Sequence, residues 1–211
     1  MQNGEKEMAE IHIVDIYNPD RQQIIHAVDI LKKGGVIVYP TDTIYGLAAD
    51  ILNKEAVFKI FKIKKVSKQK LLSLIFSDLK GVADWALIPN GAFRLMKRVL
   101  PGPYTFILPA SKGLPKSIAQ NRTTMGIRVP DAEVARKLVE ELGRPLLSAS
   151  VPKGADDYFT DPKEIAENYS HEIDLILDGG IMPTMPSTVV DFTVDPPEIL
   201  REGAGDIDAL L

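Results

Sequence analysis

The sequence predicts a single α/β domain built on a twisted, mixed β-sheet with flanking helices. Three observations lead to this fold class. Segments with helical apolar spacing alternate with short apolar segments typical of strands along the whole chain. The chain has 211 residues, 45% of them hydrophobic, which is enough for one sizeable core. No change of composition and no internal repeat marks a boundary, so we expect one domain at residues 10–211 after a mobile, polar terminus at residues 1–9.

The first elements surround a buried strand. Residues 10–17 alternate between two faces, which predicts the first strand of the sheet. Asp20 is a candidate N-cap for a helix that runs through residue 33 and ends at Gly34. Residues 36–39, Val-Ile-Val-Tyr, are β-branched and aromatic, as in strands buried on both faces. We therefore expect this second strand to lie inside the sheet.

A short polar segment follows the second strand. Pro40 cannot continue a hydrogen-bonded central strand, so the chain turns there. Thr41, Asp42 and Thr43 come next, and Gly46 permits a close ligand approach that a side chain would block. Ligands of α/β proteins usually bind at such strand ends, which makes the turn a candidate binding site. The alternative is an ordinary turn in which these side chains cap local backbone groups.

The middle of the chain predicts three helices. Asn53 is a candidate N-cap for a helix at residues 54–65, whose apolar residues form one stripe. Two shorter helices are expected at residues 77–88 and 90–100, separated by a proline. We expect each of them to flank the sheet.

Helices and strands alternate to the end of the chain. Asp131 is expected to cap a helix at residues 132–142, which ends at Gly143. Asp161 opens another helix with a capping-box-like pattern and Pro162 at its first position. The remaining strands are expected at residues 71–76, 104–109, 124–130, 145–150, 173–177, 187–192 and 199–201.

Composition excludes several classes of protein. Cysteine is absent, so a disulfide framework and a thiolate–metal site are both excluded. His12, His26 and His171 are scattered and form no ligand pair at helical spacing, so we assign no metal site. No apolar run approaches the roughly 18 residues of a membrane helix and no signal peptide is visible, so we expect a cytoplasmic protein without membrane contact. The net charge of −4 argues against a general nucleic-acid binder.

Arg128 is the candidate residue with the clearest physical reason. It stands in an apolar strand pattern, Met-Gly-Ile-Arg-Val-Pro, and a buried arginine is costly unless an anion meets it. That anion is either a ligand's carboxylate or phosphate, or an internal Asp or Glu. Arg201 is adjacent to Glu202, so its plainest explanation is a surface ion pair. Hydroxyl side chains occupy other predicted strand ends: Thr41, Thr43, Thr124, Ser148, Ser150, Ser187 and Thr188.

Six lysines gather at the end of one predicted helix and in the loop after it: Lys59, Lys62, Lys64, Lys65, Lys68 and Lys70. A helix C-terminus favours cations, so a solvated cationic surface is one interpretation. A phosphate-binding rim is the other, because adjacent like charges repel unless an anion neutralises them. No Walker loop is present, so dispersed groups of this kind would have to hold any nucleotide.

Residues 33–47, Lys-Gly-Gly-Val-Ile-Val-Tyr-Pro-Thr-Asp-Thr-Ile-Tyr-Gly-Leu, resemble the signature of the YrdC-like threonylcarbamoyl-AMP synthase family. The resemblance covers residues 10–205. Later blocks of that family follow in the same order, at residues 101–108, 125–130, 147–150, 186–191 and 199–203. The sequence is more similar to the YciO-type branch at residues 90–97, 174–180 and 201–206.

This resemblance implies a twisted α/β sheet with a positively charged concave face. It implies a reaction that joins L-threonine, bicarbonate and ATP, with Mg²⁺, into threonylcarbamoyl-AMP and pyrophosphate for a tRNA modification. It places Thr41, Arg128, Ser148 and Ser187 around the threonine. It places the nucleotide against Lys64, Lys68, Thr124, Ser150 and Arg201. Lys64 and Arg128 would act in catalysis by positioning and by neutralising charge.

Two departures from the synthase pattern lead us to expect weakened turnover. The family's Lys-x-Arg pair is Lys64-Lys65-Val66 here, and its Ser-x-Asn is Ser150-Val151-Pro152. The alternatives are a non-catalytic module that binds double-stranded RNA or tRNA, and an enzyme that hydrolyses ATP or the adenylate to AMP. The longer synthases carry a second domain, which we do not expect here because the chain ends at Leu211.

Overall fold

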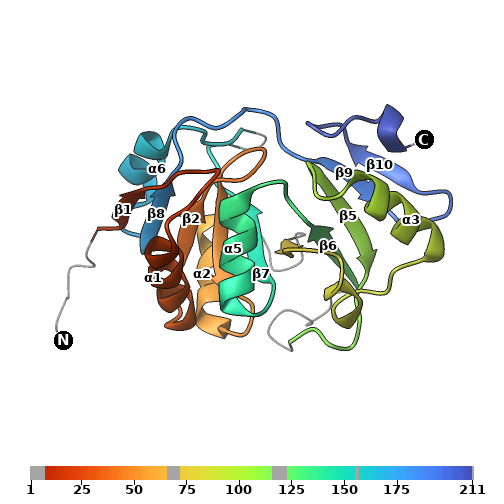
Figure 1. Ribbon diagram of the computed structural model, residues 1–211, viewed down its shortest axis with the longest axis horizontal. Coiled ribbons are helices and arrows are strands. Elements are labelled where there is room, and N and C mark those ends of the chain that lie inside the picture. The colour runs from red at the N-terminus through yellow and green to blue at the C-terminus, as the bar shows by residue number, and fades with distance from the viewer. Residues whose placement is uncertain (1–7, 66–71, 116–122, 155–156, 211) are drawn as a thin grey trace.

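The chain builds one mixed β-sheet with helices on both of its faces (Figure 1). The structure, a computed structural model, describes residues 8–65, 72–115, 123–154 and 157–210. Within these ranges ten strands join in the order β1-β8-β2-β3-β7-β4-β6-β5-β9-β10. Strand pairs β1–β8, β2–β8, β4–β6 and β5–β9 are parallel, and the other neighbours are antiparallel. The predicted single α/β domain with a mixed sheet is therefore confirmed.

The strands are short and the helices have two or three turns. The strands are β1 Glu10–Ile13, β2 Ile37–Tyr39, β3 Gly46–Asp50, β4 Ser73–Ile75, β5 Tyr104–Pro109, β6 Thr124–Arg128, β7 Leu146–Ser150, β8 Leu175–Asp178, β9 Thr188–Asp191 and β10 Glu198–Arg201. The helices are α1 Arg21–Lys32, α2 Lys54–Ile63, α3 Asn90–Val99, α5 Glu133–Leu142 and α6 Pro162–Tyr169, with 3₁₀ turns η1 Val82–Asp84 and η2 Asp208–Leu210.

Two apolar cores lie on opposite faces of the sheet. Helices α1 and α5 pack on one face, where they enclose Ile37 and Tyr39 of β2. Helix α2 packs on the other face with Val38 and Leu47. Successive strand residues point to opposite faces, so β2 contributes to both cores. This double burial explains why β2 is a continuous apolar segment, as predicted.

The predicted strand at residues 10–17 is too long. Strand β1 ends at Ile13, because the Asp15 carboxylate accepts hydrogen bonds from the backbone N–H groups of Tyr17 (2.9 Å) and Asn18 (3.1 Å) and turns the chain. Residues 1–7 of the terminus predicted to be mobile lie outside the described residues. The Ala9 N–H, by contrast, donates to the carbonyl of Ser170 at 2.8 Å.

The predicted helix at residues 77–88 is wrong. Only the 3₁₀ turn η1 forms there. The Asp78 carboxylate accepts from the Lys80 N–H at 2.7 Å, and the Leu87 N–H donates to the Pro109 carbonyl at 2.8 Å. These backbone groups therefore bond to a turn and to the end of β5 instead of to a helical ladder.

Two further details of the prediction need correction. Asp131 does not cap α5, whose N-cap is Ala132 and whose first turn has no side-chain cap. The Asp131 N–H instead donates to the Asp42 carboxylate at 3.1 Å. Strand β3, which we did not predict, continues directly from the polar turn and pairs with β2 and β7. Among the described helices, none combines the length and the apolar character needed to cross a membrane.

Candidate functional site

A cavity of about 700 Å³ lies over the central strands, between the end of α2 and strand β10. Sites for small molecules have volumes of about 300–1,000 Å³. Seven of the residues predicted from the sequence line this cavity: Thr41, Lys64, Arg128, Ser148, Ser150, Ser187 and Arg201. The fold thus brings together side chains from six separate parts of the sequence.

The two other predicted residues are Thr124, which the structure describes, and Lys68, which it does not. Thr124 begins β6, four residues before Arg128, and pairs with Pro109 on β5. It is not among the described residues that line the cavity. Lys68, together with Val66 and Lys70, lies outside the described residues. The ligand-binding roles of all nine residues remain predictions.

The cavity wall is cationic. Among the described residues that line it are five cations and no carboxylate: Lys64, Lys65, Arg128, Lys153 and Arg201. Arg128 and Lys153 form salt bridges with carboxylates that do not line the cavity, those of Asp42 and Glu164. The chain as a whole has a net charge of −4, so positive charge is concentrated here. Such a wall favours an anionic ligand.

Arg128 has an internal carboxylate partner, one of the two anions that its sequence allowed. Its guanidinium forms a salt bridge with Asp42, and the two side chains are only 11% and 10% exposed. The same Nη2 group donates to the hydroxyl of Thr43 at 2.7 Å and lies 3.5 Å from that of Thr41. The polar turn after β2 therefore holds Arg128 at the end of β6.

The internal pair does not use the whole guanidinium. The Nε atom of Arg128 is buried and has no hydrogen-bond partner among the described residues. A buried N–H without a partner is costly, and such exceptions in proteins often mark functional sites. Arg128 thus lines the cavity with part of its hydrogen-bonding capacity unused.

Tyr39 and Ser148 form a buried hydroxyl chain beside Arg128. The Ser148 hydroxyl donates to the Leu47 carbonyl at 2.9 Å. With its single proton used there, it accepts from the Tyr39 hydroxyl at 2.8 Å. Burial raises the pKa of Tyr39 to about 12, so Tyr39 keeps this proton at neutral pH. Tyr39 is a lining residue of the cavity, and its side chain is fully buried.

The packing of Tyr39 and Ser148 requires a glycine at position 46. A Cβ at position 46 would lie 2.7 Å from the ring of Tyr39 and 3.1 Å from the Ser148 hydroxyl. We expected Gly46 to allow a close ligand approach. The nearest atoms to such a Cβ belong to the Tyr39 ring, so packing also requires glycine here, and the close ligand approach remains a prediction.

Arg201 closes the opposite side of the cavity. It donates from Nε and Nη2 to the Ser187 carbonyl at 3.0 and 2.9 Å, rather than pairing with Glu202 as a surface residue would. Its Nη2 lies 3.3 Å from the Ser187 hydroxyl, which is 2.8 Å from that of Thr105. Two strand ends, β5 and β9, are thereby joined at a rim of hydroxyls and one guanidinium.

Lys64 stands where α2 ends. Its Nζ donates to the Ser150 carbonyl of β7 at 3.0 Å and lies 5.8 Å from the centre of the Tyr158 ring. Lys65 follows with a left-handed backbone, φ 49°, which is unusual for a residue other than glycine. Both lysines line the cavity, so the end of α2 presents two cations to it.

Sequence reasoning missed several polar residues that line the cavity, among them Tyr39, Tyr45, Ser73 and Thr105. Thr105 had a usable signal, since its hydroxyl interrupts an otherwise apolar strand, the same feature that singled out Arg128. The two tyrosines had none, because a tyrosine in an apolar segment is usually a core residue. Burial raises the pKa of Tyr45 well above its ordinary value, and its hydroxyl donates to the Gly180 carbonyl at 2.7 Å.

Comparison with known proteins adds independent evidence. A family model for Sua5, YciO and YrdC, described as "Telomere recombination", matches residues 29–203. The chain is 40% identical to the uncharacterized protein YciO of Escherichia coli over 206 residues, which cover 97% of this chain and all of the relative. The crystal structure of E. coli YciO matches with a TM-score of 0.91, at 39% identity and over 97% of this chain and 100% of the other.

Similarity extends to proteins with a stated activity. A threonylcarbamoyl-AMP synthase of Coxiella burnetii is 36% identical over 182 residues, 85% of this chain and 97% of the synthase. The crystal structure of Pyrococcus abyssi Sua5 complexed with L-threonine matches with a TM-score of 0.85 and 33% identity. That match covers 92% of this chain and 57% of the Sua5 chain.

Proposed function

This chain belongs to the Sua5–YciO–YrdC family, and from that premise we propose that it joins L-threonine, bicarbonate and ATP into threonylcarbamoyl-AMP, with weakened turnover. The product would serve a tRNA modification in the cytoplasm. The observation that carries the proposal is the cavity itself, with its five cations, its hydroxyls and no carboxylate among its described lining residues. All the proposed substrates, ATP, bicarbonate and the threonine carboxylate, are anionic at neutral pH.

Threonine is assigned to the part of the cavity around Arg128. Arg128 lines the cavity, and a carboxylate is a natural partner of a guanidinium. The hydroxyls of Thr41, Ser148 and Ser187 line the same cavity and can bond the threonine amine, hydroxyl or carbamate. The P. abyssi Sua5 complex with L-threonine supports this choice of amino acid.

The reaction needs no protein nucleophile. The threonine nitrogen forms a bond to the carbon of bicarbonate, water leaves, and a carbamate results. A carbamate oxygen then attacks the α-phosphorus of ATP, and pyrophosphate leaves with the electrons of the broken P–O bond. The residues contribute by positioning the reactants and by neutralising charge, which Lys64 and Lys65 can do from the end of α2 and Arg201 from β10.

Mg²⁺ would enter with the nucleotide. Mg²⁺ prefers carboxylate, phosphate and water oxygens, and no described residue lining the cavity supplies a carboxylate. These residues therefore do not fit a protein-bound Mg²⁺ site, and no step is assigned to one. Phosphate oxygens of ATP are the ligands that remain.

Pro152 is the reason to expect weakened turnover, because it lines the cavity where the synthases have asparagine. Proline offers no N–H and no amide, and the Pro152 carbonyl is already engaged by the hydroxyl of Tyr169 at 2.9 Å. Pro152 therefore cannot donate to a phosphate as the asparagine would. The loss of one electrostatic stabiliser costs about 2.7–4 kcal/mol of barrier in other enzymes.

The cationic cavity also supports the alternative role, binding of double-stranded RNA or tRNA without catalysis. A-form RNA is bound through its shape and its phosphates, which does not require the lost arginine and asparagine. The net charge of −4 weighs against that role. A third candidate is hydrolysis of ATP or of the adenylate to AMP by the same cavity.

One incubation distinguishes these functions. The protein is mixed with ATP, L-threonine, bicarbonate and Mg²⁺, and pyrophosphate and nucleotide products are followed together. The synthase predicts pyrophosphate and an adenylate that both require threonine, whereas the hydrolase predicts AMP without threonine. An RNA-binding module would form neither product. It would bind RNA with an affinity that falls steeply with salt and in the variants Lys62→Glu and Lys65→Glu.

A further inference from the structure

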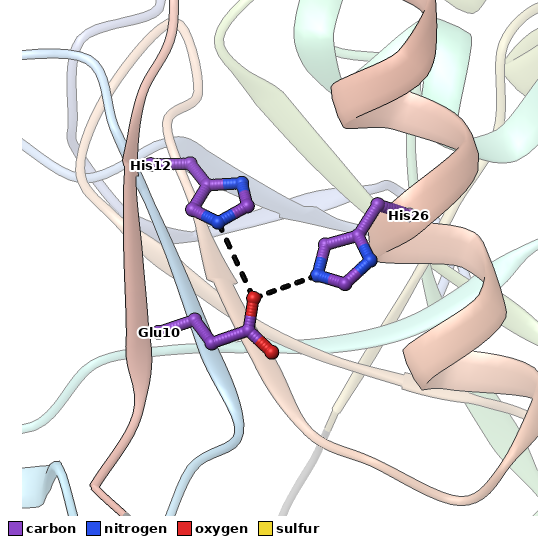
Figure 2. A group of neighbouring side chains, drawn as sticks. All are labelled: Glu10, His12 and His26. Atoms are coloured by element: carbon purple, nitrogen blue, oxygen red, sulfur yellow. Dashed lines mark hydrogen bonds and ion pairs between the residues drawn. The ribbon is translucent and has the colours of Figure 1, made fainter.

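A second cluster of chemically active side chains lies at the far edge of the sheet, outside the cavity (Figure 2). Glu10, His12 and His26 each direct one ligand atom to a common point, and these atoms lie within 4.8 Å of one another. The Glu10 Oε2 atom is 3.3 Å from Nε2 of His12 and 2.7 Å from Nε2 of His26. The two imidazole rings stack with their centroids 5.2 Å apart at an angle of 15°.

The fold holds this cluster between two elements. Glu10 and His12 are two positions apart on β1, so they share one face of the sheet, and His26 faces them from α1. Gln23, one turn before His26, donates from its side chain to the carbonyl of Ile13 at 2.8 Å. This bond fixes α1 beside β1. The sequence spacing hid the pair of histidines because each comes from a different element.

We propose that Glu10, His12 and His26 form a site for a divalent cation of the Zn²⁺ type. Two imidazole nitrogens and one carboxylate oxygen are the donor set that Zn²⁺ uses in three-ligand sites, with water in the fourth position. Hard cations such as Mg²⁺ prefer oxygen donors alone. The side chains are 51%, 34% and 42% exposed, in the order Glu10, His12, His26, so the cation and its water can reach them.

The two distances from Glu10 lie near the tetrahedral spacing, and the histidine nitrogens lie within 4.8 Å of each other. Tetrahedral Zn²⁺ with bonds of 2.0–2.1 Å sets its ligand atoms about 3.3–3.4 Å apart. The His12–Glu10 distance of 3.3 Å already matches. The His26–Glu10 distance of 2.7 Å has to open by roughly 0.6 Å, the difference from that tetrahedral spacing, which a rotation of the half-exposed Glu10 side chain supplies.

A cation at this site would stabilise the fold and would take no part in the chemistry of the cavity. Strand β1 is at one end of the sheet order, and none of the three residues lines the cavity. Strand β1 pairs on one side only, with β8. A cation shared between β1 and α1 fastens this edge strand to the body of the domain. Binding to the folded state alone raises the stability of the whole chain.

The test is Zn²⁺ titration of untagged, chelator-treated protein by calorimetry, with Co²⁺ as a spectroscopic probe. We expect one Zn²⁺ per chain, a Kd in the micromolar range, a higher Tm with Zn²⁺, and visible absorption bands of tetrahedral Co²⁺. His12→Gln and His26→Gln should each weaken binding at least tenfold. The matched control, His171→Gln, alters an exposed histidine outside the cluster and should bind as the wild type does.

Three results would overturn the site. One is wild-type binding weaker than 1 mM, which would leave the cluster a set of ordinary ion pairs. Another is unchanged affinity in either His12→Gln or His26→Gln. The third is displacement of Zn²⁺ by a tenfold excess of Mg²⁺. Circular dichroism of each variant shows that it is folded, and Glu10→Gln provides a third variant that should also bind at least tenfold more weakly.

Discussion

Replacement of Arg128 by lysine separates a ligand role from a structural one. A lysine keeps the positive charge opposite Asp42, so the fold should survive. It loses the planar fork, which in the wild type reaches Asp42 and the Thr43 hydroxyl through Nη2 and leaves Nε without a partner in the described chain. We therefore expect Arg128→Lys to bind threonine less well, with nucleotide affinity changed much less.

The size of this loss follows from one charge-assisted hydrogen bond. Such bonds contribute about 1.5–3 kcal/mol, and about 1.4 kcal/mol changes an equilibrium constant tenfold, so Kd for threonine should rise about 10- to 150-fold. Isothermal titration calorimetry with threonine, in the presence and absence of a non-hydrolysable ATP analogue, measures it. Titration with the nucleotide alone gives the comparison.

Arg144→Lys is the matched control. Arg144 also pairs with a buried carboxylate, that of Asp50, but it lies outside the cavity. It should lower stability without changing threonine affinity. Unchanged threonine affinity in Arg128→Lys would refute the reasoning and leave Arg128 as the structural partner of Asp42. An unfolded Arg128→Lys protein would lead to the same conclusion.

Three other predictions concern stability. Asp42→Asn leaves the Arg128 charge buried without a counter-ion, so it should lower the free energy of unfolding, measured by urea denaturation, by about 3–5 kcal/mol. The control, Asp78→Asn, changes an exposed carboxylate and should change that free energy by less than about 0.5 kcal/mol. Gly46→Ala places a Cβ 2.7 Å from the Tyr39 ring and should lower the free energy of unfolding by about 1–3 kcal/mol through overpacking. Gly91→Ala is its control, because a Cβ there has no atom within 4 Å. Equal effects of the two substitutions would contradict the packing argument. Burial alone would raise the pKa of the Asp50 carboxyl, but hydrogen bonds from Arg144 and the Leu52 N–H hold that pKa below its usual range. That contribution to stability is present at neutral pH and is lost as the pH falls through the folded-state pKa. Arg144→Met lacks it, so the difference in free energy of unfolding between the wild type and Arg144→Met should shrink as the solution is acidified; a difference that does not change with pH would show that the ionised pair contributes nothing.

Most strands of the sheet could be predicted from the sequence because each of them is a short apolar segment. Strand β2 shows why, since burial on both faces makes every residue of it apolar. Residues 77–88 show the limit, because Asp78 and the end of β5 take the backbone hydrogen bonds that a helix would have used. Partners that come from distant segments are not visible in a local pattern.

Part of the candidate site could also be predicted from local patterns in the sequence. The isolated hydroxyls and Arg128 were identified because polar groups at the ends of apolar strands need partners. Which partner Arg128 has, Asp42 or a ligand, depends on how β6 lies beside the turn after β2, and local spacing does not contain that information. The cluster of Glu10, His12 and His26 was missed for this reason as well.

The most direct test of the central claim is incorporation of labelled bicarbonate. Wild-type protein is incubated with ¹⁴C-bicarbonate, ATP, L-threonine and Mg²⁺, and the nucleotide products are separated and counted. The proposal predicts ¹⁴C in an adenylate, with one pyrophosphate released per label incorporated, and loss of both when threonine is omitted. Pyrophosphate or AMP that forms without threonine and without ¹⁴C in any nucleotide would contradict it.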